Sequence, residues 1–96
     1  MDVRIQSLHF EVSEKLTEFI NKKAERLAHR YPSITTVEAT LKVVKPETAM
    51  NKEVVLLAVT PQTTAAATKT ADSFEEAVDL ALEAIERQLE KHKDSK

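Results

Sequence analysis

The sequence predicts a single α+β domain, residues 1–96, in which both helices cover one face of a four-stranded sheet. Three observations support this. Four short segments read as strands, and two longer segments repeat apolar residues every three or four positions, as amphipathic helices do. The segments follow the order β-α-β-β-β-α. A chain of 96 residues is also long enough for one hydrophobic core without staples.

The first two elements are a strand and a long helix. Residues 2–8 alternate apolar and polar side chains, which is typical of a half-buried strand. Residues 14–30 form an amphipathic helix, for which Ser13 is the expected N-cap. Pro32 ends it, because proline disfavours the helical conformation in the preceding residue. The apolar stripe of this helix contains Leu16, Phe19, Ile20, Ala24, Leu27, Ala28 and Tyr31.

Three strands follow. Residues 37–43 alternate apolar and polar side chains, residues 45–52 read as a loop, and residues 53–60 form the third strand. Pro61 favours a turn, but no Gly or Asn is present for a two-residue hairpin, so we expect a longer connection before the strand at 63–71. Short connections predict antiparallel pairing among these strands, whereas a helical crossover makes the first two strands parallel.

The final segment is a second amphipathic helix. Ser73 and Glu76 have the spacing of a capping box at its start. Its apolar stripe contains Phe74, Ala77, Val78, Ala81, Leu82, Ile85 and Leu89.

Composition excludes several chemistries. The chain has no cysteine, hence no disulfide or thiol nucleophile, and no glycine, hence no Gly-rich phosphate loop. Its three histidines lack a metal-binding spacing, and no nucleophile-base pair appears. We therefore expect no enzyme activity, cofactor, metal or small-molecule substrate. No apolar run approaches the length of a membrane span and the N-terminus lacks a secretory signal, which favours a cytoplasmic protein.

The charges of the first helix separate by sign. On a helical wheel, five cations occupy one flank at roughly 200 to 300° from Ile20, whereas the acids lie at roughly 120 to 160°. The cations are Lys15, Lys22, Lys23, Arg26 and Arg30, and the acids are Glu14, Glu18 and Glu25. Such a flank is either a solvated surface or a binding face for a polyanion such as RNA. The formal net charge of −2 argues mildly against an RNA partner.

The second helix repeats the pattern more weakly. Arg87 and Lys91 lie opposite a row of acids, which are Glu75, Asp79, Glu83, Glu86 and Glu90. Acids early and bases late also suit the helix dipole, so this layout has a purely structural explanation. Two basic flanks on adjacent helices would nevertheless create a local positive surface. Among the aromatic residues, Phe10 is the one free candidate for stacking on a base.

Several segments resemble one family. The pattern from Ile85 to Lys93 is similar to the closing helix of the short ribosome hibernation promoting factors, also called ribosome-associated inhibitors or sigma-54 modulation proteins. Further similarity lies in Glu11 to Leu16, Phe19-Ile20, Lys22 to Leu27, Leu41-Lys42-Val43 and Asp72-Ser73-Phe74. Family members often have glycine where this chain has Ser7-Leu8 and Pro61-Gln62.

The resemblance implies a function. It indicates a fold akin to double-stranded-RNA-binding domains, and a bacterial stress-response or stationary-phase factor that binds the decoding region of the small ribosomal subunit, obstructs mRNA and tRNA, and keeps idle ribosomes silent. By position, Lys23, Arg26, Arg87, Lys91 and Lys93 match its rRNA-binding residues, and the wheel adds Lys22 and Arg30. Because the sequence ends at Lys96, we expect a short form of the hibernation promoting type.

A second interpretation stays open. The strand at 53–60 is apolar on both faces, and we expect Val55, Leu57 and Val59 to face the helices. The opposite set, Val54, Leu56 and Ala58, would then form an exposed apolar face. Such a face favours a protein-interaction module that regulates transcription or self-assembles as a weak homodimer.

Overall fold

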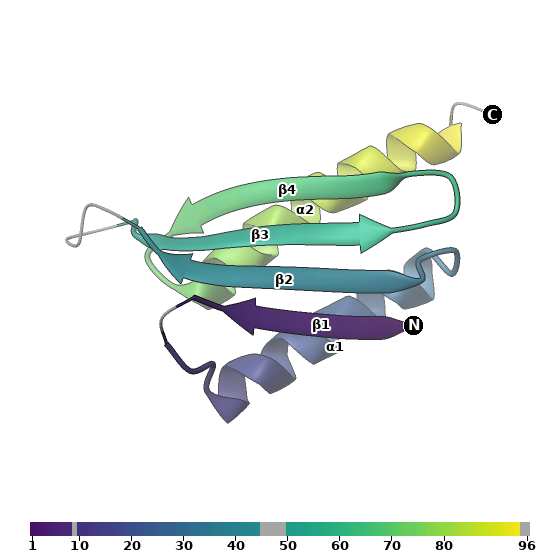
Figure 1. Cartoon of the computed structure of the whole chain (residues 1–96). Coiled ribbons are helices and arrows are strands. Elements are labelled where there is room, and N and C mark those ends of the chain that lie inside the picture. The colour runs from purple at the N-terminus through teal and green to yellow at the C-terminus, as the bar shows by residue number, and fades with distance from the viewer. Residues whose placement is uncertain (9, 45–49, 95–96) are drawn as a thin grey trace.

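Figure 1 shows the computed structural model, in which both helices lie against one face of a four-stranded sheet. The structure describes residues 1–96 except His9, 45–49 and 95–96, and it does not describe the side chains of residues 92–94. The elements are β1 (Asp2–Ser7), α1 (Glu14–Arg30), β2 (Thr36–Val43), β3 (Lys52–Val59), β4 (Thr64–Ala71) and α2 (Phe74–Asp94). The predicted α+β class and element order are confirmed.

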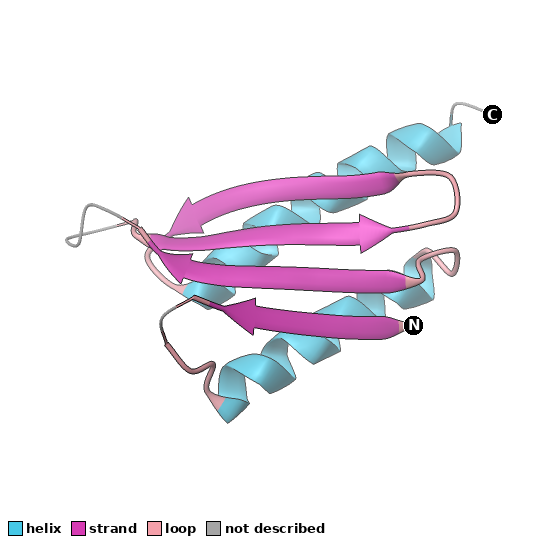
Figure 2. Cartoon of the chain, in the orientation of Figure 1, coloured by secondary structure: helices cyan, strands magenta, loops and turns pink. Residues whose placement is uncertain are grey.

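The sheet has the order β1-β2-β3-β4 (Figure 2). β1 runs parallel to β2, with Val3 opposite Val37, and α1 forms the crossover between them. The other two pairs are antiparallel, as the short connections predict. In the part of the chain that the structure describes, neither helix combines the length and apolar character needed to cross a membrane.

Local hydrogen bonds set the ends of both helices. The hydroxyl of Ser13 accepts from the backbone N–H of Leu16 at 3.1 Å, and that of Ser73 accepts from Glu76 N–H at 3.2 Å. These side chains satisfy N–H groups that have no partner in the first helical turn. At the other end of α1, the N–H of Tyr31 donates to the carbonyl of Leu27. The predicted N-caps therefore define the first turn of each helix. Of the capping box predicted at Ser73 and Glu76, the structure shows the bond from Glu76 N–H to the Ser73 hydroxyl.

The connections between the strands also follow local chemistry. Residues 60–63 join β3 to β4, and the hydroxyl of Thr60 bridges this turn by accepting from Thr63 N–H at 3.0 Å and donating to Thr63 O at 2.9 Å. Residues 45–49 of the predicted loop 45–52 lie outside the described residues. At its end, Met50 has φ of 52° and donates its N–H to Asp72 Oδ1 at 2.7 Å.

The core lies between the sheet and the two helices. Its largest fully buried side chains are Ile20, Leu41, Leu56, Ile85, Val37, Val54 and Val78. The predicted orientation of β3 is wrong, because Val54, Leu56 and Ala58 face the helices and are at most 1% exposed. Both alternating sets of β3 are apolar, so the β3 sequence alone does not choose a face. The pairing of β3 with β2 decides which set faces the helices, because Leu56 lies opposite Ala39, which belongs to the apolar set of β2.

The open face of the sheet carries apolar side chains in β3 and mostly polar ones in the strands beside it. Val55, Leu57 and Val59 lie on it, half-buried, in the middle of the sheet. Their neighbours across the strands are Thr36, Glu38, Thr40, Thr64, Ala66 and Thr68. A single apolar strand is thus flanked on both sides by threonine-rich strands.

α2 also closes part of one sheet edge. The side-chain amide of Gln88 donates from Nε2 to the carbonyl of Ala66 at 2.6 Å and accepts the N–H of Ala66 at 3.0 Å. Ala66 belongs to β4, which has no further strand beside it. The amide therefore takes the place of a neighbouring strand at this residue.

Candidate nucleic-acid interface

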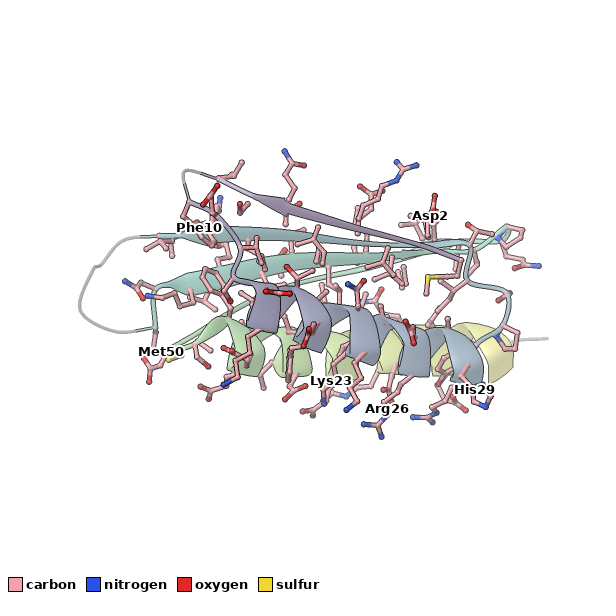
Figure 3. The ribbon with its side chains drawn as sticks, turned by 90° about the horizontal axis from the view of Figure 1, so that it is seen from below. Asp2, Phe10, Lys23, Arg26, His29 and Met50 are labelled. Atoms are coloured by element: carbon pink, nitrogen blue, oxygen red, sulfur yellow. The ribbon has the colours of Figure 1, made fainter. Side chains whose placement is uncertain are left out.

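α1 presents its cations in two rows on the side turned away from the sheet, where Figure 3 shows Lys23 and Arg26 projecting. Lys15, Lys22 and Arg26 form the outer row, and all three side chains are exposed. Lys23 and Arg30 form the inner row, which faces α2. The repeat of the helix produces both rows, because positions three, four and seven apart share a side.

The inner row is paired with acids of α2. Lys23 Nζ lies 3.2 Å from Asp79 Oδ1, and Arg30 Nη1 lies 2.8 Å from Glu86 Oε2. Lys23 also lies over the ring of Phe19, 5.3 Å from its centroid. The flank is basic on α1 itself, but its inner row lies against carboxylates of α2. The acids come from another helix, which a wheel of α1 cannot show.

These pairs line a groove between the helices. Its volume is about 240 Å³, and its walls and floor are Lys23, Arg26, Leu27, Arg30, Asp79, Leu82, Glu83 and Glu86. Contacts of residue 23 with 79 and residue 30 with 86 show that the two helices run in the same direction. The groove thus has a basic wall from α1, an acidic wall from α2 and an apolar floor.

A hydrogen bond joins the C-terminal parts of the helices beyond the groove. The hydroxyl of Tyr31 donates to Glu90 Oε2 at 2.5 Å, and the Arg30 guanidinium lies 5.6 Å from the Tyr31 ring centroid. The hydrogen bond to Glu90, assisted by burial and by the Glu90 charge, raises the pKa of Tyr31 to about 12. Together with the Arg30–Glu86 pair, these contacts hold the groove at one end.

Arg87 and Lys91, two of the predicted basic residues of α2, do not join those of α1. Arg87 is 75% exposed and pairs with Glu83 on its own helix at 3.7 Å, and Lys91 is exposed. The helical repeat places both beyond the acidic row as seen from α1. The two basic flanks are therefore separated by the groove acids. Lys93 lies in α2, but its side chain is outside the described part of the structure.

Phe10 does not belong to the candidate interface. The ring of Phe10 stacks on Phe74 with centroids 5.2 Å apart and planes 15° apart, so Phe10 is not free to stack on a base. Among the residues that the structure describes, no three His, Asp or Glu side chains form a group that could hold a metal ion. The candidate interface is thus made of charged groups on α1 and α2.

Residues 3–96 match the sequence profile of the family described as "Sigma 54 modulation protein / S30EA ribosomal protein". The chain belongs to this family. Its members are ribosome-associated factors and are not known as enzymes. The resemblance seen in the helices is thereby confirmed. No curated protein matches the sequence.

Solved structures show the same fold. One is a ribosomal subunit interface protein from Coxiella burnetii, with a TM-score of 0.86 and 24% identity over 98% of this chain and 99% of that chain. Another is the N-terminal domain of Protein Y from Thermus thermophilus, with a TM-score of 0.79 and 16% identity over 96% of this chain and 99% of that chain. At these identities the likeness concerns the fold.

Proposed function

We propose that this protein silences idle ribosomes by binding the decoding region of the small subunit and obstructing mRNA and tRNA. The family match over residues 3–96 is the observation that carries the proposal. The ribosomal subunit interface protein with the same fold also supports it. Residues 1–96 act as one ribosome-binding domain in the cytoplasm, without cofactor or catalysis.

The rows of α1 supply the main contacts to rRNA. Lys22 and Arg26 are exposed and make no ion pair among the described residues, so phosphates reach them without displacing an acid. Lys23 and Arg30 contribute from the inner row. Arg87 and Lys91 make secondary contacts from the other side of α2, and Lys93 contributes from the last turn of that helix. Local cation rows bind phosphate even though the formal net charge is −2.

Co-sedimentation with purified small subunits over a range of salt tests this function. If about five phosphates are neutralised, the logarithm of the binding constant should fall with the logarithm of salt with a slope of about −3.5 to −4.5. A slope near zero would instead indicate a contact with ribosomal protein. Absence of binding at low salt would overturn the proposal.

A pair of variants tests the outer row. Lys22→Gln combined with Arg26→Gln should weaken binding by about tenfold or more and reduce the magnitude of the salt slope by about two, because each phosphate contact contributes about one. The matched control is Arg4→Gln with Lys42→Gln, which makes the same change in charge on the sheet, and it should keep the slope. Equal effects of both pairs would show that net charge acts, and not the outer row.

The open sheet face supports a second candidate, a protein-interaction module that self-associates. The half-buried column of Val55, Leu57 and Val59 is the observation behind it. If two copies pair through this column, the wild type sediments as a dimer and Leu57→Lys as a monomer. A monomeric wild type at high protein concentration excludes this candidate.

A further inference from the structure

We propose that the acidic wall of the groove sets the RNA selectivity of this protein by competing with phosphate for the inner row. The specificity-determining residues are Asp79, Glu83 and Glu86 of α2. This inference rests on the proposed function and assigns a role to acids in a face that binds an anion.

The ion pairs place these acids where phosphate must come. Lys23 is 29% exposed and 3.2 Å from Asp79, so a phosphate that contacts its ammonium group lies within a few ångströms of a carboxylate. Arg30 is held in the same way by Glu86 at 2.8 Å. Like charges at such distances repel, and salt screens them little, because the Debye length at 0.1 M is about 10 Å.

The repulsion extends along the groove. Asp79, Glu83 and Glu86 are spaced four and three residues apart, so a carboxylate appears at each turn of α2. The cations Lys23, Arg26 and Arg30 follow a similar spacing on the opposite wall. A phosphate chain lying in the groove would therefore meet one carboxylate beside Lys23 and another beside Arg30.

Flexible and rigid RNA respond differently to this arrangement. A flexible strand gains most binding free energy when its phosphates follow a continuous row of cations. The acids remove that gain within the groove. A folded rRNA surface can present its phosphates to the outer row and to the solvent side of Arg30, which is 60% exposed. The acids thus penalise unwanted partners more than the intended one, which is how repulsive elements produce specificity.

The experiment compares Asp79→Asn with Glu86→Gln against the control Glu18→Gln with Glu25→Gln. Both pairs remove two acids, but Glu18 and Glu25 are exposed on the opposite flank of α1. Affinities are measured for purified small subunits and for poly(U) as a flexible RNA. The groove variant should bind poly(U) about tenfold more tightly than the wild type does, and its affinity for subunits should rise by less. The affinity of the control variant should rise about twofold or less for both poly(U) and subunits.

A groove variant that gains no more on poly(U) than the control would overturn the proposal. The poly(U) measurement decides the role of the acids even if the wild type fails to bind subunits, an outcome that sinks only the proposed function. Thermal melts accompany each variant. If the double variant is unfolded, Asp79→Asn alone decides, because Asp79 pairs with Lys23 of α1 and this change leaves the Arg30–Glu86 pair in place. A gain on poly(U) with this variant supports the proposal, and no gain overturns it.

Discussion

The protonation of Tyr31 is linked to folding. Its pKa is raised to about 12, mainly because its hydroxyl donates a hydrogen bond to Glu90. Since the folded-state pKa lies above the ordinary value of 10.0, folding favours the neutral phenol. The resulting stability is fully present below about pH 10 and is lost as the pH rises towards about 12.

Tyr31→Phe should therefore remove a pH-dependent part of the stability. The variant loses one hydrogen bond and should be less stable at neutral pH by about 1 kcal/mol. That difference from the wild type should shrink between about pH 10 and 12. Urea unfolding followed by circular dichroism at several pH values measures it, and a constant difference across this range would contradict the assignment.

Cations three positions apart on α1 have different partners. Lys23 pairs with Asp79, 56 positions away in sequence, whereas Arg26 makes no ion pair among the described residues. The wheel of α1 correctly predicted that both lie on one flank. It could not predict the pairing, because that depends on how far α2 is shifted along α1. The residue-level composition of the site therefore required the tertiary structure.

The elements themselves could be predicted almost to their ends, because the signals that bound them are local. Ser13 and Ser73 cap the helices through bonds within their own turns, and Pro32 follows the end of α1 closely. No such local signal determines which side-chain set of β3 faces the helices. Its two apolar sets differ only in what lies across the strand, so the alternating pattern of β2 was the signal that could have decided it.

β3 gives a direct test of this assignment. Leu56→Lys buries a charge in the core and should destabilise the protein by about 3 kcal/mol or more. Leu57→Lys places the same charge on the open face and should cost about 1 kcal/mol or less. Urea denaturation of both variants measures the difference. The reverse order of stabilities would restore the orientation that the sequence first suggested.

At the scale of the whole molecule, Gln88 connects the helical layer to the edge of the sheet. Gln88→Ala should lower stability by about 1 to 2 kcal/mol, because two exposed hydrogen bonds are lost. The amide proton of Ala66 should then exchange with solvent faster than in the wild type. Gln62→Ala, in the exposed turn before β4, is the control and should leave this exchange unchanged. Unaltered protection of Ala66 in the Gln88 variant would show that the side chain does not close the edge.

The fold and the family were predictable over nearly the whole chain, since both depend on apolar spacing and on motifs in the two helices. The structure confirms the order of the elements, and the family profile matches residues 3–96. The charge distribution was less predictable. Because the helices pack in the same direction, the cation rows of α1 lie beside the acidic wall of α2, and the bases of α2 lie beyond it. That packing turns a sequence-level basic flank into a groove of mixed charge.

Tyr31 also gives this protein a built-in optical signal. It is the only tyrosine, and the chain has no tryptophan, so the longer-wavelength intrinsic fluorescence comes from one ring. That ring lies beside Arg30, and its hydroxyl donates a hydrogen bond to Glu90, where the two helices meet. Any partner that separates Arg30 from Glu86 changes the surroundings of the ring. Opening of the groove can therefore be followed by its emission, without attaching a dye.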